Sequence, residues 1–238
     1  MTPGKADWVR ICLFLLFLLP TVPAYCQRGT LDLNLGETTD QFASLPSVSD
    51  AVLDINGDVT VIRPSQKHGG PSIVAGGEIR VPSDTNNHSK EFAVYGGAIW
   101  GVHNFSIGFD GGVRKIYMPP ARVSGQTLNR DNLETLELPL VIRYKFGPEK
   151  RAFLEVKGAP ELTPHYKRSS LNTVPLPSPS LDHGYFLRGR IGYNFGKWWY
   201  VAGTYETRYF KFESNLGNPS NLYNWKSNIV TGGVGLRF

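Results

Sequence analysis

The side chains best suited to acid–base chemistry in this sequence are its five histidines, because histidine titrates near neutral pH. They are His68, His88, His103, His165 and His183. A hydrolase would need one of them beside a serine or an aspartate. His88 precedes Ser89, and His183 follows Asp182. Neither pair belongs to a recognisable catalytic motif, so we predict no catalytic residues and a non-enzymatic protein.

Other sites that bind cofactors or nucleic acid are also missing from the sequence. No two histidines have the spacing of metal ligands on one strand, and no glycine-rich phosphate loop follows a strand and opens a helix. The cysteines are Cys12 and Cys26, both close to the start of the chain. The formal net charge is +5, too mild a balance to indicate nucleic-acid binding. We therefore predict no metal, no cofactor and no nucleic-acid partner.

Charged side chains recur at every second position in several segments, with apolar side chains between them. In residues 135–146, Glu137, Arg143 and Lys145 alternate with leucine, isoleucine, tyrosine and phenylalanine. A period of two places the charges on one face of a β-strand. Basic residues on the charged faces are Arg80, Arg114, Arg143, Lys145, Lys157, Arg188, Arg190, Arg208 and Arg237. The acidic ones are Glu78, Glu91, Asp110, Glu137, Glu155, Glu161 and Glu206.

The elements that must position these charges are eight predicted β-strands between Gly70 and Phe238. They cover residues 72–81, 91–102, 105–114, 135–146, 154–165, 185–195, 199–209 and 230–238. Their connections alternate in length, from the pair His103 and Asn104 to the long segment 118–132. Long loops at one end and tight turns at the other are typical of outer-membrane barrels.

Residues 1–26 have the composition of a secretory signal peptide. Lys5 and Arg10 supply a cationic start, and residues 9–19 are almost wholly apolar. This apolar run is about half the ~20 residues that a membrane-spanning helix needs. Cleavage is expected after Ala24 or, preferably, after Cys26. The alternative is that Cys26 is the lipid-modified first residue of a lipoprotein.

Residues 27–69 fit the strand pattern less well. Asn56 and Gly57 lie between two short apolar segments, which is a strong signal for a hairpin turn. Strands as short as these would not cross a membrane, which takes ~9 to 11 residues for a tilted strand. We therefore predict a periplasmic extension over 27–69, followed by an eight-stranded antiparallel up-and-down barrel over 70–238. A ten-stranded barrel that absorbs the extension is the alternative.

Three features favour a transmembrane barrel over a soluble, lipocalin-like one. The predicted strands are roughly twice as long as the ~5 to 6 residues common in soluble sheets. Aromatic residues gather near strand ends, where a bilayer has its headgroups, as in the run from Trp198 to Tyr200. The charged face carries both signs and is rich in arginine, which suits paired burial better than a solvated face.

The last residues carry a specific resemblance. Residues 231–238, with Thr231, Gly233, Leu236 and Phe238 as its marked positions, resemble the C-terminal signal that the outer-membrane assembly machinery recognises. The strand pattern resembles the small bacterial outer-membrane β-barrel superfamily that includes the outer-membrane protein A barrel domain. Two departures are the missing peptidoglycan-binding domain after the barrel and the unmatched segment before it. The resemblance implies an outer-membrane location and contact with lipid and lipopolysaccharide.

These observations support three hypotheses for function. The first is a monomeric, non-enzymatic barrel whose inner charges pair and close it, and which serves envelope structure or surface interaction. The second is a narrow solute channel, and the third is a lipid-modifying enzyme that uses His165 or His183. We assign the interior ion-pair network to Arg80, Arg114, Glu137, Arg143, Glu155, Lys157, Glu161, Arg188, Arg190, Glu206, Arg208 and Arg237.

Overall fold

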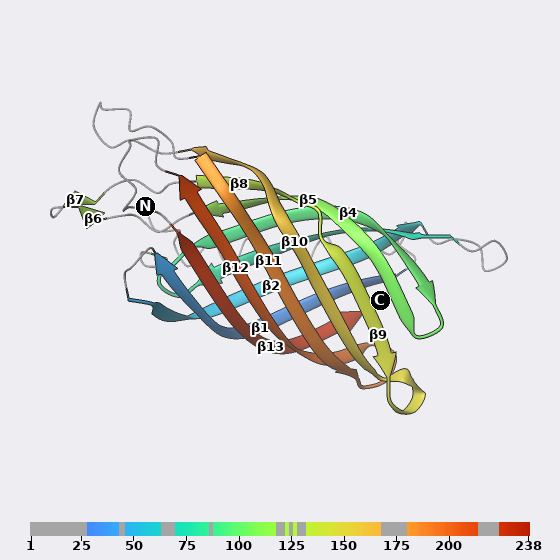
Figure 1. Cartoon of the computed structure of the whole chain (residues 1–238). Helices are drawn as coiled ribbons and strands as arrows, with labels where there is room; N and C mark the ends of the chain where they lie inside the picture. The colour runs from blue at the N-terminus through green and yellow to red at the C-terminus, as the bar shows by residue number, and fades with distance from the viewer. Residues whose placement is uncertain are drawn as a thin grey trace.

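Alternating strands of this chain fold into one antiparallel sheet that closes on itself as a barrel (Figure 1). The computed structural model describes residues 28–42, 46–62, 70–85, 88–117, 122–123, 126–127, 132–167, 180–213 and 224–238. Within these residues, no helix is long and apolar enough to cross a membrane.

The barrel sheet is built from eleven strand segments. They are β1 (Arg28–Phe42), β2 (Val48–Ile62), β3 (Ser72–Pro82), β4 (Lys90–Val102), β5 (Phe105–Tyr117), β8 (Asn132–Glu137), β9 (Leu140–Phe146), β10 (Ala152–Lys167), β11 (Ser180–Asn194), β12 (Trp199–Glu213) and β13 (Trp225–Arg237). A separate small sheet holds β6 (Arg122–Val123) and β7 (Gln126–Thr127), and Pro148–Lys150 forms the 3-10 turn η1.

Closure of the barrel comes from β1 and β13, which pair along their length from Thr30 opposite Arg237 to Phe42 opposite Trp225. Segments β8 and β9 share one place in the wall, because both pair with β5 on one side and with β10 on the other. Pro139 separates them, since proline has no N–H to donate to the ladder. Its carbonyl instead accepts a hydrogen bond from the Asp110 N–H at 3.1 Å. The wall therefore has ten strand positions.

The prediction of eight strands was wrong, and the ten-stranded alternative describes the barrel. Strands β1 and β2 come from residues 28–62, most of the segment assigned above to a periplasmic extension. Asn56 and Gly57 lie inside β2, opposite Asp32 and Leu31 of β1, so they form no hairpin turn. The local turn signal was outweighed because β2 gains ladder hydrogen bonds from both β1 and β3. The predicted signal peptide, residues 1–26, lies outside the described residues.

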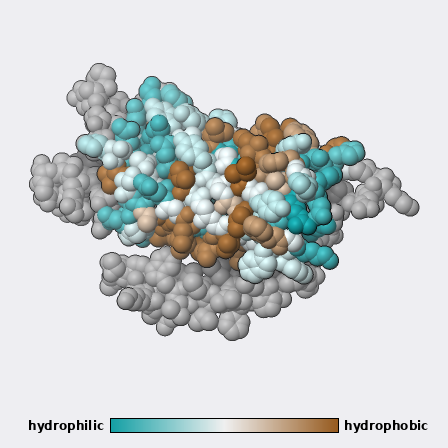
Figure 2. Space-filling view, turned by 90° about the horizontal axis from the view of Figure 1, so that it is seen from below, coloured by the Kyte–Doolittle hydropathy of each residue, from teal (hydrophilic) through white to brown (hydrophobic). Residues whose placement is uncertain are grey.

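Alternation along each strand sorts the side chains by polarity. Large apolar side chains cover the outside of the wall, among them Leu33, Leu35, Phe92, Val94, Phe109, Leu136, Leu140, Leu187, Ile191, Tyr205, Val230 and Val234. Figure 2 shows hydrophobic residues across the middle of one face, between hydrophilic ends. Charged and polar side chains are buried inside. This arrangement is the reverse of a soluble barrel and suits a wall that faces lipid.

The two ends of the barrel differ in their connections. At the end that holds Arg28 and Phe238, the strands are joined by residues 63–71, 103–104, 147–151 and 195–198. The other end has the connections 43–47, 83–89, 118–131, 168–179 and 214–224. Outer-membrane barrels have short periplasmic turns and longer extracellular loops. We therefore refer to the end with the chain termini as the periplasmic end.

Candidate functional site

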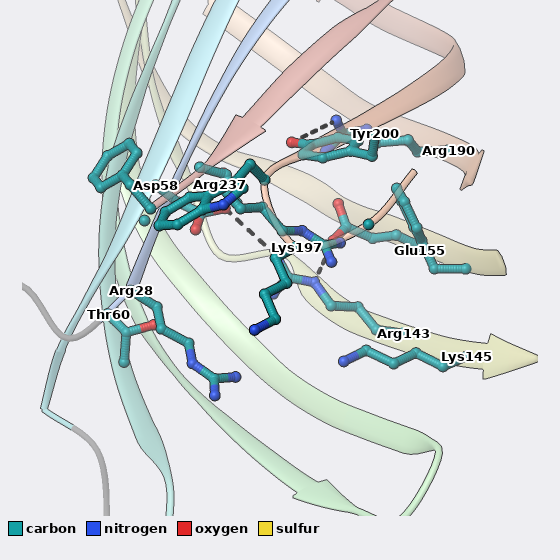
Figure 3. Close-up of a pocket in the computed structure, with 16 residues that line it drawn as sticks. Arg28, Asp58, Thr60, Arg143, Lys145, Glu155, Arg190, Lys197, Tyr200 and Arg237 are labelled. Carbon is teal, nitrogen blue, oxygen red and sulfur yellow. Dashed lines mark hydrogen bonds and ion pairs between the residues drawn. The ribbon is translucent and has the colours of Figure 1, made fainter. Parts of the chain in front are cut away.

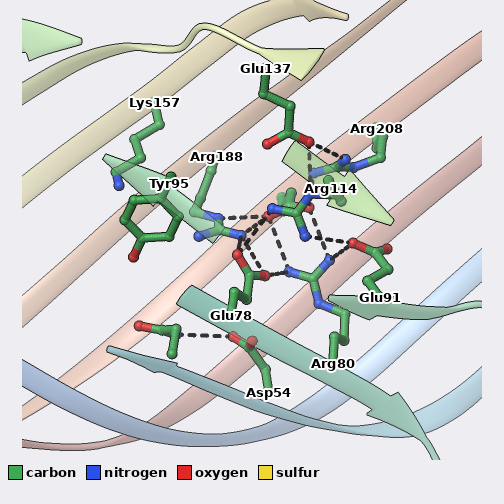
Figure 4. Close-up of polar contacts among 12 residues, drawn as sticks. Asp54, Glu78, Arg80, Glu91, Tyr95, Arg114, Glu137, Lys157, Arg188 and Arg208 are labelled. Atoms are coloured by element: carbon green, nitrogen blue, oxygen red, sulfur yellow. Dashed lines mark hydrogen bonds and ion pairs between the residues drawn. The ribbon is translucent and has the colours of Figure 1, made fainter. Parts of the chain in front are cut away.

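Four arginines and four glutamates meet in the middle of the barrel lumen (Figure 4). This central cluster consists of Glu78 and Arg80 on β3, Glu91 on β4, Arg114 on β5, Glu137 on β8, Arg188 on β11, and Glu206 and Arg208 on β12. The strand period of two turns these side chains inward, as where Glu78 and Arg80 flank the outward-facing Ile79. Six of the ten strand positions contribute to the cluster, and β3 and β12 supply two members each.

Arg80 holds three carboxylates of the central cluster at once. Its Nη2 lies 2.6 Å from Glu78 Oε1, and its Nη1 lies 2.9 Å from Glu91 Oε2 and 3.1 Å from Glu206 Oε1. Arg114 contacts two of the same carboxylates, Glu78 at 3.1 Å and Glu91 at 2.9 Å. The planar guanidinium suits this role because its N–H groups fan out in a fixed fork.

Glu137 joins Arg114 to Arg208 on the other side of the cluster. Its Oε1 accepts hydrogen bonds from Arg114 Nε and from Arg208 Nη1, both at 2.7 Å. Arg208 Nη2 also lies 3.2 Å from Glu206 Oε1. The side chain of Arg208 is 0% exposed, so these contacts are shielded from water and salt.

Arg188 connects opposite walls of the barrel. Its Nη2 lies 2.7 Å from Glu78 Oε2 on β3, and its Nε donates to Glu206 Oε2 on the neighbouring β12 at 2.6 Å. Strands β11 and β3 are five positions apart in the ring of ten, which places them on opposite sides. A direct ion pair between them shows that the central cluster spans the lumen.

The charges of the central cluster are balanced. Each glutamate contacts two or three arginines, and the numbers of positive and negative groups are equal. Isolated buried charges are costly, whereas a set with full pairing and hydrogen bonding is tolerated. Pairing therefore explains how so many ionised groups are accommodated in the interior.

A second layer of ion pairs lies between the central cluster and the periplasmic end. Lys157 Nζ is 2.9 Å from Asp110 Oδ2, Arg143 pairs with Glu155, and Arg190 Nη2 is 2.5 Å from Asp32 Oδ1. These residues come from β1, β5, β9, β10 and β11. The second layer therefore lies against the central cluster on its periplasmic side.

Comparison with known proteins bears on the fold. No protein-family model matches the chain, and no curated protein matches it. The outer membrane protease OmpT from Escherichia coli is 12% identical, with 89% of this chain and 97% of that chain covered and a TM-score of 0.57. A deletion mutant of TodX, a monoaromatic hydrocarbon channel, is 7% identical, with 88% of this chain and 89% of that chain covered and a TM-score of 0.38. Ail of Yersinia pestis is 10% identical, with 88% of this chain and 99% of that chain covered and a TM-score of 0.28.

At identities this low the likeness extends to the fold alone, and of these three structures OmpT has a TM-score above 0.5. The fold of this chain is similar to that of OmpT. Its own structure has a closed antiparallel wall, an apolar exterior and a charged interior, as a transmembrane barrel requires. The chain has the fold of an outer-membrane β-barrel. Within the described residues, every strand position of the wall pairs on both sides, which is the condition for a β-structure to cross a bilayer.

Of the twelve residues assigned to the network of this outer-membrane barrel, ten form ion pairs in the two layers. They are Arg80, Arg114, Glu137, Arg143, Glu155, Lys157, Arg188, Arg190, Glu206 and Arg208. The side chain of Glu161 lies outside the described residues. Arg237 forms no ion pair with a carboxylate in the described part of the chain and stacks over the Tyr200 ring at 4.9 Å.

Sequence reasoning missed the interior residues of β1 and β2. Asp32 belongs to the second layer, and Asp54 lies buried 3.4 Å from Asn34 Nδ2 and 3.3 Å from Asn56 Nδ2. The signal that could have found them is the alternation of Leu31, Leu33 and Leu35 with polar residues.

The four marked residues of the predicted assembly signal lie at the seam that closes the barrel. Thr231 and Gly233 face inward, and Leu236 faces outward. The Phe238 N–H donates to the Gly29 carbonyl at 3.1 Å, and the Gly29 N–H donates to the Phe238 carbonyl at 2.8 Å. The Phe238 ring lies over Gly29, where a Cβ would clash with it.

The histidines are not gathered into one site in the described part of the barrel. His103 is exposed in the turn after β4, and the ring of His183 on β11 lies 5.9 Å from that of Tyr209. His68 and the side chain of His165 lie outside the described residues. No group of three or more histidine, cysteine, aspartate or glutamate residues among those described could hold a metal ion.

His88 is buried at the extracellular end and anchors the connection between β3 and β4. Its Nδ1 lies 2.9 Å from Asp40 Oδ2 of β1, and each side chain is 1% exposed. The hydrogen bond with Asp40 raises the pKa of His88, and the nearby Asp50 and Asp84 add to this rise. A buried imidazole with no free access is poorly placed for catalysis, so we interpret it as a structural contact.

The His88 contact predicts a pH-dependent stability. Because the pKa is raised in the folded protein, the contact stabilises fully below the unfolded pKa of about 6.5 and is lost as pH rises through the folded pKa. His88→Gln should lower the free energy of unfolding by about 1–3 kcal/mol at pH 5.5 and by less at pH 9. Urea titrations of the protein in detergent micelles measure this. The exposed His103→Gln is the control, and an equal loss at both pH values would contradict the prediction.

Proposed function

We propose that the protein is a non-enzymatic outer-membrane barrel, closed by its central cluster, that serves envelope structure and presents its extracellular loops for surface interaction. The observation that carries this proposal is the direct ion pair between Arg188 and Glu78, which joins opposite walls at 2.7 Å. The ion-paired side chains cross the middle of the lumen and connect its opposite walls. They hold the barrel rigid and leave no wide path for solutes.

Solute transport would require the central cluster to open. Arg80 and Arg114 are each 3% exposed, and each contacts three carboxylates. Moving either side chain aside would strand buried charges, at several kcal/mol for each uncompensated ion. The balanced and dense pairing therefore favours a closed barrel over a narrow channel.

Catalysis would require an accessible base beside a nucleophile. His88 is buried against Asp40, and His183 faces outward from β11. Neither has, in the described part of the chain, the arrangement of nucleophile, base and orienting group that hydrolysis uses. We therefore favour a role without chemistry over lipid modification.

The outer surface suggests the partners. Its apolar side chains suit lipid, and long extracellular loops would lie among lipopolysaccharide. The C-terminal residues around Phe238 resemble the signal for the assembly machinery. A monomer suffices for this role, because β1 pairs with β13 and the described strands close into a sheet without needing a second copy.

Liposome swelling tests the closed barrel. Vesicles that contain the purified protein and are placed in an isotonic solution of a small sugar should swell no faster than protein-free vesicles, because the central cluster blocks the lumen. Swelling at a rate that rises with the amount of folded protein would support the channel instead.

Lipid A analysis tests the absence of chemistry. The mass spectrum of lipid A from a Gram-negative host that expresses the protein should match that of the host alone. A new lipid A species that disappears with His165→Ala or His183→Ala would contradict the non-enzymatic role.

A further inference from the structure

The periplasmic end of the lumen contains a cavity of about 720 Å³ (Figure 3). Its walls come from the start of β1, the facing ends of β9, β10 and β11, the turn at Gly196, Lys197 and Trp198, and the C-terminal Phe238. Second-layer residues form its inner boundary, with the central cluster beyond them. We call this cavity the vestibule. Its volume is that of a site for a small organic molecule.

The charge of the vestibule is unbalanced, unlike that of the central cluster. The lining contains six basic residues but two acidic ones, Asp58 and Glu155. The basic residues are Arg28, Arg143, Lys145, Arg190, Lys197 and Arg237. A concave site of one sign with low-dielectric walls concentrates the field and attracts ions of opposite charge.

Three of these cations lack an ion pair with any carboxylate in the described part of the chain: Lys145, Lys197 and Arg237. The two carboxylates are already engaged, since Glu155 pairs with Arg143 and Asp58 lies 3.8 Å from the same guanidinium. Figure 3 shows the side chains of Lys145 and Lys197 projecting into the same open space. The vestibule therefore presents three cationic side chains that pair with no carboxylate of the described residues.

Aromatic rings position the guanidinium groups without neutralising them. Arg237 lies over the rings of Tyr200 at 4.9 Å and Phe153 at 5.9 Å, and Arg190 lies over the same two rings at 5.3 Å and 5.7 Å. Cation–π stacking holds a guanidinium in place and leaves the N–H edge of Arg237 available to a ligand, whereas Arg190 also pairs with Asp32. Such preorganisation lowers the entropic cost of binding.

We propose that the vestibule binds a small organic anion that carries two or more phosphate or carboxylate groups and enters from the periplasm. Arginine forks and lysine ammonium groups are the donors that such groups prefer. The basic lining side chains on the strands, such as Arg143, Lys145 and Arg190, lie on the lumen face and not on the lipid face, which favours a soluble anion over the headgroup of a bilayer lipid. A closed centre makes this a binding site and not a point of passage. Only the statement that the anion does not pass through the barrel rests on the proposed function.

Calorimetric titration of the purified, folded protein in detergent tests this proposal, with tripolyphosphate and citrate as probes. We expect saturable one-to-one binding that weakens as salt increases. Lys145→Ala and Lys197→Ala should each weaken binding about tenfold or more, the range for one charge-assisted hydrogen bond. Lys226→Ala, at an exposed site on the outer face of β13, is the matched control and should bind as the unchanged protein does.

Three results would overturn the proposal. One is no saturable binding of either probe. Another is equal weakening by the Lys226 control. The third is binding only to vesicles that contain phosphatidylglycerol, unaffected by the Lys145 and Lys197 substitutions, which would assign the charge to lipid headgroups. Heat-modifiable migration on a gel, compared between heated and unheated samples, verifies that each variant is folded. A swelling assay that showed a channel would contradict the proposed function and leave this titration valid.

Discussion

Glu78→Gln is expected to lower the free energy of unfolding by about 3–5 kcal/mol, the range for removing one partner from a buried ion pair. Glu78 contacts Arg80 at 2.6 Å, Arg188 at 2.7 Å and Arg114 at 3.1 Å. Glutamine keeps the shape of the side chain and removes its charge. Three buried arginines would then share the remaining carboxylates, and the central cluster would carry one uncompensated positive charge.

Urea-induced unfolding in detergent or lipid vesicles measures this loss. The matched control is Glu149→Gln in the periplasmic turn after β9, where the exposed side chain pairs with Arg151. An exposed pair contributes about 0–1 kcal/mol, so the control should unfold almost as the unchanged protein does. If both variants unfolded at the same urea concentration, the central cluster would have no special role in stability.

Gly233→Ala is expected to prevent most of the protein from reaching its folded form. Gly233 lies on β13 opposite Asn34 of β1, at the seam that closes the barrel. A Cβ at this position would lie 2.6 Å from the Asn34 Cα and would also clash with the Leu33 carbonyl oxygen. Both obstacles are backbone atoms of the neighbouring strand, so the seam itself would have to open.

Gly232→Ala is the matched control, one residue away on the same strand. A Cβ there would have the Ala202 carbonyl oxygen as its nearest neighbour, at 3.9 Å, which is ordinary contact. The fraction of protein that migrates in the heat-modifiable, folded position on a gel measures closure. We expect a several-fold lower fraction for Gly233→Ala alone, and equal fractions for the two variants would contradict the importance of this close approach.

The sequence pattern predicted most of the wall, because a period of two over many residues is a local signal. Segment 135–146 shows this well: its alternate residues Glu137, Arg143 and Lys145 face inward, as their spacing indicates. Aromatic and β-branched residues on the other face match a pleated surface against lipid.

Strands β1 and β2 were harder to predict, because their stability comes from distant partners. The pairing of β1 with β13 joins the two ends of the described chain, and no local pattern encodes it. In β2, the adjacent Asn56 and Gly57 favour a turn, yet both take strand positions between β1 and β3. Long-range ladders therefore overrode a local preference.

The candidate site was predictable in its members but not in its partners. Alternation indicates which charges face inward, whereas the partner of each depends on the closed ring. Arg188 and Glu78 are 110 residues apart and meet only because β11 and β3 lie on opposite walls. Arg237 was expected in the network, and instead it lines the vestibule, because it lies one residue from the end of the seam.

The electrical conductance of the protein in a planar lipid bilayer tests most directly whether the central cluster closes the lumen. Purified protein, verified as folded by heat-modifiable migration, should insert and produce no steady unitary current under an applied voltage. Reproducible current steps of constant size, which scale with salt concentration and appear only with folded protein, would show a continuous ionic path and contradict a closed lumen.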